Sequence, residues 1–411
     1  MKFIHAADIH LDSPLRGLAR YEGAPVEQMQ SATRRAFVNL IDLACEEAVD
    51  FMILAGDLYD MDWKDYNTGL FFNQQMNRLN QAGIAVYLLR GNHDAENLMT
   101  KQLRLPDNVH VFSAQQPETF VIDALGVALH GQSFAGRAVT EDLSEAYPPA
   151  LAGLFNIGVL HTSLNGREGH QTYAPCTLSG LLMHGYDYWA LGHVHKREVL
   201  NEQPHVVFAG NLQGRHARET GAKSCTLVEV QGKEISLSAR EVDVLRWEVL
   251  ELDARELQQL EELLDQADVA VTQALQQAEE RPLAVRLVVT GRSVLHSELH
   301  SQFEQWSNDL RATINNASFG KAWVEKIQLK TQPLRDNLPL EGPLSELFEI
   351  LRALPDNEAE LQKLGEEFKA LKQALPSELR TREEGFDPES PETIKNLLPQ
   401  VEELLLGRLS A

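Results

Sequence analysis

The sequence has few cysteines, a deficit of basic residues and no long apolar run. The 411 residues include 3 cysteines, which lie far apart and form no C-x-x-C pair: Cys45, Cys176 and Cys225. This excludes a disulfide framework and a zinc ribbon, and it favours a reducing cytosol. No apolar run reaches the ~18 residues that a membrane span needs. His5 and Asp8 interrupt the N-terminus too early for a signal peptide. We therefore expect a cytoplasmic protein with no membrane-spanning segment.

The shortage of basic residues bears on possible partners. Lys and Arg total 37 against 60 for Asp and Glu, which gives a net charge of −23. Domains that bind nucleic acid usually present a basic surface. Charge alone therefore argues against binding to nucleic acid, and any such binding by the isolated chain should be weak and sensitive to salt. The apolar fraction of 43% excludes a mostly disordered chain.

Histidine is concentrated in the first half of the chain, where twelve of the 14 lie between His5 and His216. That half alternates short apolar runs with segments of helical periodicity, which predicts a layered α/β domain over residues 1–241. Helices are expected at 26–49 and 67–82. Strands are expected at 2–7, 51–55, 85–89, 127–130, 157–161, 188–191, 206–209, 225–230 and 235–239.

Residues 242–332 alternate three expected strands with two expected helices within a short stretch of sequence. Strands are expected at 245–252, 283–290 and 323–331, with helices at 254–280 and 295–317 between them. This predicts a small α+β domain without a polar cluster suited to catalysis.

The last segment, 333–411, begins with a proline-marked linker and is then expected to be helical. Apolar residues recur every three or four positions over 361–375 and again over 394–405, so each stretch has one apolar stripe. These stripes either pack within the chain's own domains or dock onto a helix or groove of a partner.

Five short motifs follow predicted strands in the first domain. They are Asp8-Ile9-His10, Gly56-Asp57, Gly91-Asn92-His93-Asp94, His161 and Gly192-His193-Val194-His195. In α/β sheets, ligands bind outside the carboxyl ends of the strands, so residues far apart in sequence meet there. Taken singly, the Gly-Asn-His-Asp motif could be a turn and His161 a core histidine. All five in this order predict one site.

The residue types in these motifs suit a metal centre. Side chains alternate along an extended segment, so Asp8 and His10 should point to the same side, and likewise His193 and His195. The Asp57 carboxylate has two oxygens and can bridge two cations. Oxygen and imidazole ligands without a thiolate favour manganese, iron or zinc.

The ordered motifs resemble the signature of the calcineurin-like metallophosphoesterases. The stretches HAADIHLDSPL and GDLYD are similar to those of the bacterial SbcD/YhaO group of DNA-repair exonucleases. The resemblance implies an α/β (α+β layered) fold, with a double β-sandwich flanked by helices, a small α+β capping domain and a helical C-terminal tail. It implies two divalent metal ions, with manganese favoured, and hydrolysis of DNA phosphodiester bonds by an exonuclease or endonuclease. It also implies an SbcC-like coiled-coil ATPase bound by the tail, and a homodimer.

The resemblance assigns roles to the motif residues. Asp57 would bridge the metals, and His93 would protonate the leaving oxygen with Asp94 orienting its ring. The remaining ligands would be Asp8, His10 and His195 for the first metal, and Asn92, His161 and His193 for the second. Related nucleases often have a histidine at the position of Asp60, so the phosphate contact of that histidine is in doubt here.

Two further questions concern the substrate. Basic residues in loops beside the motifs are either contacts for the DNA backbone or ordinary surface charge: Arg16, Lys196, Arg197 and Arg215. The alternative enzyme is a phosphatase or phosphodiesterase that acts on nucleotides or other small phosphate esters. The capping domain favours the DNA substrate, because a small monoester needs no second domain. A non-catalytic scaffold would not need the complete ligand set.

Overall fold

The computed structural model describes residues 1–13, 31–59, 66–95, 104–136, 138–164, 173–334, 343–375 and 387–409. Arg16, Asp60 and the expected start of the helix at 26–30 lie outside these ranges. The chain divides into two compact units. The first contains residues 1–249, 273–286 and 318–325, and the second contains residues 250–272, 287–317 and the chain from 326 onward. The predicted domain boundaries at 241 and 332 stay a prediction.

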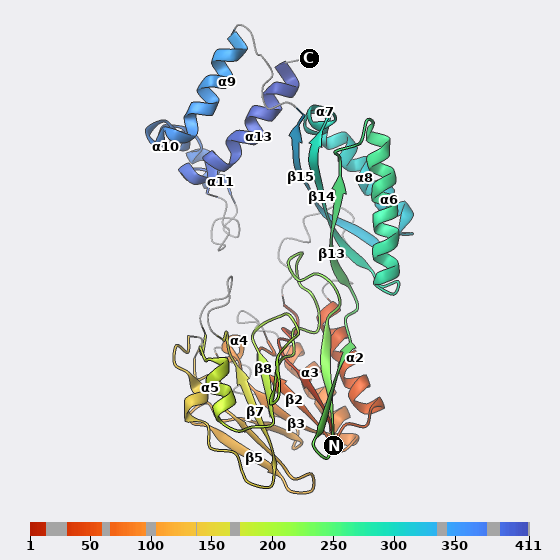
Figure 1. Ribbon diagram of the computed structural model, residues 1–411, viewed down its shortest axis with the longest axis vertical. Helices are drawn as coiled ribbons and strands as arrows, with labels where there is room; N and C mark the ends of the chain where they lie inside the picture. The colour runs from red at the N-terminus through yellow and green to blue at the C-terminus, as the bar shows by residue number, and fades with distance from the viewer. Residues whose placement is uncertain are drawn as a thin grey trace. The chain divides into compact units, whose positions relative to one another are not determined.

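Two six-stranded sheets form the first unit (Figure 1). One sheet has the order β12-β11-β1-β2-β3-β4 and the other the order β5-β6-β7-β8-β10-β9. The strands of the first are β1 Lys2–Ala6, β2 Phe51–Ala55, β3 Ala85–Leu89, β4 Val109–Val111, β11 Ser224–Gln231 and β12 Glu234–Glu241. Those of the second are β5 Glu118–Ile122, β6 Val127–Gly131, β7 Phe155–His161, β8 Tyr188–Gly192, β9 Glu198–Glu202 and β10 His205–Phe208.

A buried apolar layer joins the inner faces of the two sheets. Phe3 and Phe51 of the first sheet belong to the same cluster as Ile157 and Tyr188 of the second. Phe3 stacks on Phe51 and meets the Tyr188 ring edge-on. Because side chains alternate along each strand, the neighbouring residues face outward and need a second covering layer.

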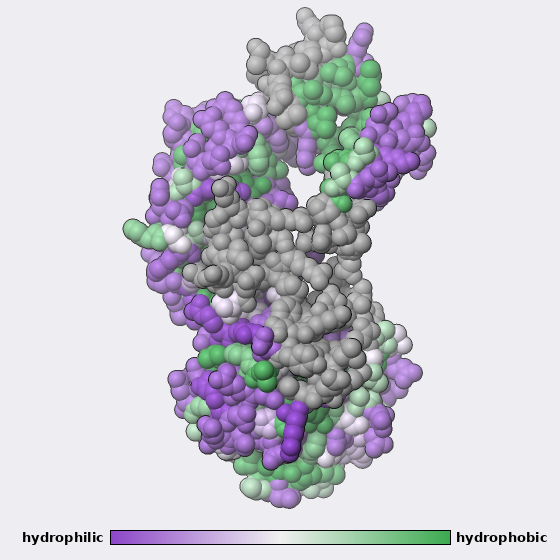
Figure 2. Space-filling model, turned by 180° about the vertical axis from the view of Figure 1, so that it is seen from behind, coloured by the Kyte–Doolittle hydropathy of each residue, from purple (hydrophilic) through white to green (hydrophobic). Residues whose placement is uncertain are grey.

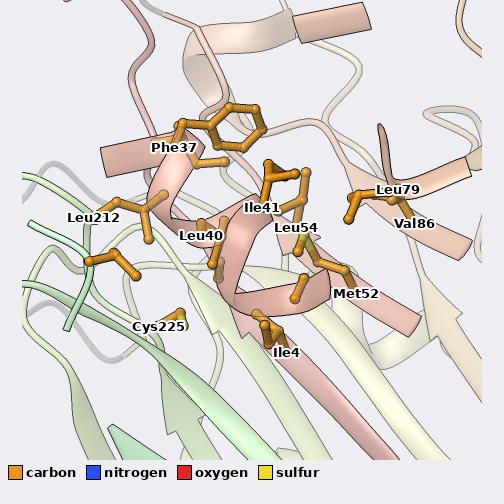
Figure 3. Close-up of a cluster of buried hydrophobic side chains, with 14 of the residues drawn as sticks. Ile4, Phe37, Leu40, Ile41, Met52, Leu54, Leu79, Val86, Leu212 and Cys225 are labelled. Atoms are coloured by element: carbon orange, nitrogen blue, oxygen red, sulfur yellow. The ribbon is translucent and has the colours of Figure 1, made fainter. Parts of the chain in front are cut away.

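Helices supply that covering layer. Helices α2 Ala32–Glu46 and α3 Tyr66–Gln81 pack on the outer face of the first sheet, where Phe37, Leu40 and Ile41 meet Ile4 and Met52 (Figure 3). The outer face of the second sheet carries a separate cluster that contains Trp189 of β8 and Leu181 of α5 Leu178–Met183. The double β-sandwich flanked by helices is therefore confirmed.

The strands that the sequence pattern failed to predict lie at the edges of the sheets. Strands β4, β5 and β9 were not predicted, and each is an edge strand. None of the three has a buried residue, because one long side of an edge strand has no neighbouring strand. A strand in that position needs no continuous apolar run, so the apolar pattern used for the interior strands misses it.

A third sheet has three strands in the order β13-β14-β15. They are β13 Arg246–Asp253, β14 Leu283–Ser293 and β15 Ala322–Pro333. Helix α6 Leu260–Gln277 begins six residues later than predicted. The helix expected at 295–317 is two helices, α7 His296–Ser301 and α8 Phe303–Ala317.

The tail is helical, as expected, and its helices pack on one another. They are α9 Pro343–Ala353, α10 Glu358–Glu367, α11 Lys369–Ala374 and α13 Pro391–Leu409, with a short 3₁₀ turn at Leu354–Asp356. Leu361, Ile394 and Leu398 form a small buried cluster, and α13 lies against α7 of the same unit. Part of both predicted stripes is therefore buried within the chain. Over the described residues, no helix is both long and apolar enough to cross a membrane.

Candidate metal centre

Side chains from both sheets meet at the carboxyl ends of their parallel strands. Strands β1, β2 and β3 are parallel neighbours in the first sheet, and β7 and β8 are parallel neighbours in the second. All five predicted motifs lie at or directly after these strand ends. The structure therefore brings together distant residues such as His10 and His195, which are 185 positions apart.

Two groups of ligand-type atoms result. One group contains Asp8, His10 and His195, whose ligand atoms all lie within 4.8 Å of one another. The other contains Asp57, His161 and His193, with the same spacing. In the first group, Nε2 of His10 and Nε2 of His195 are only 3.2 Å apart.

Asp57 lies between the two groups. Its Oδ2 is 3.4 Å from Nε2 of His161 and 3.9 Å from Nε2 of His10. Its Oδ1 accepts the backbone N–H of His93 at 3.0 Å, which fixes the orientation of the carboxylate. Oδ1 of Asn92 is 3.0 Å from Nε2 of His161. Asp57 thus approaches a histidine of each group, and Asn92 faces the second group.

Hydrogen bonds on the far sides of two rings determine which nitrogen faces the site. Nδ1 of His161 donates to the carbonyl of Ala55 at 3.0 Å, and Nδ1 of His195 donates to Oε1 of Glu219 at 2.6 Å. Both partners can only accept, so each neutral ring turns the lone pair of Nε2 toward the centre. A carboxylate or carbonyl behind the ring is the usual support of a metal-binding histidine.

The charge balance of the site also calls for a cation. Burial raises the pKa of Asp8 to about 6, and nearby His195 and His161 offset only part of this. Burial would lower the pKa of His161, but the charge of Asp57 and its hydrogen bond raise it to about 9. The buried carboxylates of Asp8 and Asp57 thus favour a positive charge beside them. A divalent cation supplies that charge, and the donor set of carboxylate, amide and imidazole fits such an ion.

The backbone of these loops differs from the predicted extended form. Asp8, His10 and Asp57 have φ of 51°, 46° and 52°, and His193 has φ of 97°. The expectation of alternating side chains on extended backbone is therefore wrong, although Asp8 and His10 do meet. Left-handed conformations cost energy in residues other than glycine, and they persist where the surrounding structure holds them.

Close packing leaves no room for a side chain at one glycine of the site. A Cβ on Gly91 would lie 2.2 Å from Oδ1 of Asp57 and 2.8 Å from its backbone nitrogen. Gly91 thus lets the loop after β3 approach the loop after β2, which sets the position of the bridging carboxylate.

His93 lies at the rim rather than inside the ligand groups. It belongs to the short helix α4 Asn92–Ala95, and its side chain is 29% exposed. Nε2 of His93 is 3.9 Å from Oδ2 of Asp57, and its ring meets that of His10 edge-on. Its position allows it to reach a bound group from the solvent side without acting as a ligand.

Comparison with known proteins identifies the family. The model of the calcineurin-like phosphoesterase family matches residues 1–197, and that of the YhaO metallophosphoesterase middle domain matches residues 247–332. The uncharacterized metallophosphoesterase YhaO of Bacillus subtilis (strain 168) is 37% identical over 295 residues, which are 71% of this chain and 72% of the relative. This chain belongs to the calcineurin-like metallophosphoesterase family. The family consists of metal-dependent phosphoester hydrolases, so a divalent metal centre is expected where the two groups lie.

Two more distant relatives are named as a DNA repair protein and as a subunit of a nuclease. The DNA double-strand break repair protein Mre11 of Methanopyrus kandleri is 24% identical over 213 residues, covering 47% of this chain and 44% of that protein. One component of the SbcCD nuclease of Staphylococcus saprophyticus is 24% identical over 263 residues, covering 57% of this chain and 67% of that protein.

Asp94 has partners other than the one expected for it. Its carboxylate accepts the backbone N–H groups of Leu58 and Tyr59 at 3.1 and 2.9 Å and that of Gly91 at 3.1 Å. Burial raises its pKa to about 7, and the charge of Asp57 adds to the effect. These contacts tie the loop after β2 to the loop after β3, and orientation of His93 by Asp94 stays a prediction.

The predicted basic contacts divide into different environments. Lys196 and Arg197 line a cavity beside His195. Nη2 of Arg215 is 3.8 Å from Oε1 of Glu219, and its Nη1 is 3.4 Å from the hydroxyl of Ser13.

Sequence reasoning missed Glu219, which is buried and holds His195. It lies in the long connection between β10 and β11, where no strand or periodic pattern marks it. A single acidic residue there gives no signal until the chain is folded.

Proposed function

We propose that this metallophosphoesterase is a DNA exonuclease and endonuclease that uses two divalent metal ions, with manganese as the physiological ion. The main support is Asp57, whose Oδ2 faces His161 of one ligand group and His10 of the other. The names of two distant relatives support DNA as the substrate and an SbcCD-like repair complex as the setting. The three free cysteines suit a cytoplasmic enzyme.

The chain's own residues have distinct tasks in this proposal. When bound, the two cations would neutralise phosphate charge and supply a hydroxide near neutral pH. Asp8, His10 and His195 would hold one of them, and Asn92, His161 and His193 the other, with Asp57 shared. His93, partly exposed at the rim, would donate a proton to the leaving oxygen, because histidine is the side chain that most often acts as a general acid.

Hydrolysis of two kinds of phosphate ester tests this function. The purified chain is incubated with Mn²⁺ and end-labelled DNA, and separately with p-nitrophenyl phosphate and bis(p-nitrophenyl) phosphate. We expect DNA and the diester to be cleaved. We expect His93→Ala to lose about 10²- to 10⁴-fold in rate, the usual range for a general acid, while it still binds metal. Rapid hydrolysis of the monoester with no cleavage of DNA would instead identify a small-molecule phosphatase.

The tail is proposed to bind a coiled-coil ATPase, as the similarity to a component of an SbcCD nuclease suggests. Although Leu361, Ile394 and Leu398 pack inward, other apolar residues of the same helices stay exposed. Ile350 on α9 is 64% exposed, and Figure 2 shows apolar surface over the tail helices. This surface has the amphipathic helical character that docks into grooves or onto partner helices.

Co-purification of a point variant and a truncated chain tests this contact, and the point variant keeps every helix of the unit in place. The full chain, Ile350→Glu and a truncation before Arg335 are each expressed with the coiled-coil ATPase of the same genome. Val269→Glu, at a residue of α6 that is 55% exposed, is the matched control. We expect recovery of the ATPase with the full chain and the control only. Equal recovery with all four proteins would exclude tail docking.

A further inference from the structure

A cavity of about 760 Å³ lies beside the candidate metal centre. Its walls come from the segment after β8, residues 194–197, and from the connection between β10 and β11, residues 209–211 and 216–224. His195 is part of the wall, so the cavity is continuous with one end of the first ligand group. Apart from the DNA contacts predicted for Lys196 and Arg197, none of the roles assigned above uses the rest of this space.

The charge of the cavity is opposite to that of the chain. Four cationic side chains line it: Lys196, Arg197, Arg218 and Lys223. Among the described residues, Glu219 is its only acidic lining residue, and that carboxylate already accepts from His195, Asn211 and the backbone of Arg215. A concave site with one sign of charge concentrates ions of the opposite sign. In a protein with a net charge of −23, a cationic hollow beside the candidate metal centre locally reverses the charge that an approaching anion meets.

Lys223 is the decisive residue of this cavity. It is only 8% exposed, yet among the described residues no carboxylate forms an ion pair with its ammonium group. Burial lowers its pKa, and the more distant charges of Glu219 and Asp243 offset part of that effect. Burying a charge without a partner costs free energy that a bound counter-ion returns. Within the part of the chain that the structure describes, a largely buried cation thus stands at the cavity wall without a carboxylate in ion-pair contact.

Two further features of the cavity lining favour a phosphate as the bound anion. Nε of Arg197 donates to the Thr226 hydroxyl at 3.0 Å, which holds the guanidinium at the wall. The side chains of Thr220 and Ser224 add hydroxyl donors to the same lining. A fixed guanidinium, an ammonium and hydroxyls together match the several acceptor oxygens of a phosphate group.

We propose that this cavity binds a second phosphate of the substrate, next to the phosphate at the metal centre. This deepens the proposed function, because it predicts a preference for substrates with at least two neighbouring phosphates, such as DNA or a 5′-phosphorylated dinucleotide. An ester with a single phosphate leaves the cavity unused. Lys223 is the residue on which this preference depends most.

The first experiment measures anion binding and does not depend on any hydrolytic activity. Pyrophosphate is titrated by calorimetry into the metal-free full chain, Lys223→Met, Lys223→Arg and the matched surface control Lys233→Met. We expect about tenfold weaker binding by Lys223→Met alone, because a charge-assisted contact is lost. Its melting temperature should be unchanged or higher, since methionine removes an unpaired buried charge. Equal binding by the full chain and Lys223→Met would overturn the proposal. So would a fall in melting temperature for Lys223→Met without rescue of binding in Lys223→Arg.

The second experiment asks whether the same cavity serves catalysis. With Mn²⁺ present, we expect Lys223→Met to raise KM about tenfold for a 5′-phosphorylated dinucleotide. Its kcat, and both constants for bis(p-nitrophenyl) phosphate, should be unchanged. An equal effect on both substrates would contradict a second phosphate site. If neither substrate is hydrolysed by the parent chain, the proposed function fails while the binding result for pyrophosphate still stands.

Discussion

Replacing Glu219 with glutamine tests how the His195 ring is held toward the metal centre. The Glu219 carboxylate accepts from Nδ1 of His195 at 2.6 Å, from the Asn211 amide at 2.9 Å and from the Arg215 backbone N–H at 2.7 Å. Glutamine keeps the shape but turns one acceptor oxygen into a donor. If its oxygen faces His195, its amide opposes two donors. If its amide faces His195, the ring must take the other tautomer, and the hydrogen on Nε2 then points at the metal position.

Either orientation of the glutamine amide should weaken metal binding at His195. A hydrogen bond to a charged group contributes about 1.5–3 kcal/mol, and loss of a supporting partner commonly costs about 10- to 100-fold in metal affinity. We expect a loss of that size at the group of Asp8, His10 and His195. Affinity at the group of Asp57, His161 and His193 should stay within about twofold of the parent, because Glu219 does not touch it.

Titration with Mn²⁺, followed by calorimetry and by electron paramagnetic resonance, resolves the two sites. Glu256→Gln, at an exposed residue of the other unit, is the control for a lost surface charge. If both sites of Glu219→Gln bind Mn²⁺ with the same affinities as in the parent, the proposed role of Glu219 is refuted. Equal losses at both sites would also refute it, since they would indicate a general disturbance of the fold.

Three further predictions concern packing, pH and metal. Gly91→Ala should reduce phosphoester hydrolysis at least about 100-fold, because its Cβ would displace the Asp57 carboxylate. Gly136→Ala, where a Cβ meets nothing within 4 Å, should not change the rate. Burial lowers the pKa of His5 to about 3 from 6.5, so the stability that neutral His5 provides is complete above pH 6.5 and is lost toward pH 3. On acidification, the parent should therefore lose about 1.4 kcal/mol of unfolding free energy per pH unit relative to His5→Gln. The difference between their melting temperatures should narrow accordingly, and a constant difference would contradict this. Mn²⁺ at 100 times its Kd should stabilise the first unit by about 2.7 kcal/mol for each site it fills, measured by calorimetry, and excess chelator should reverse this stabilisation.

The interior of the double sandwich could be predicted because its strands are buried on both faces. Phe51–Ala55 and Tyr188–Gly192 are buried throughout, and such strands must be apolar along their whole length. Edge strands such as Val109–Val111 and Glu118–Ile122 are only partly buried, so mixed composition is tolerated and the pattern fails. In the tail, periodicity predicted the stripes but not which residues stay exposed, because that depends on how α9, α10 and α13 meet.

By itself, the sequence determined which chemical groups stand at the strand ends and in what order, and hence a centre of carboxylate, amide and imidazole. Parallel strands bring their carboxyl ends to the same edge, so this convergence follows from local order alone. Only the tertiary structure decided the support around that centre. The support of His195 by Glu219, the left-handed backbone at Asp8 and the burial of Lys223 in its cavity depend on loops that fold against distant strands. Such contacts produce no periodic pattern in the sequence, because each is made by a single side chain whose position depends on the rest of the fold.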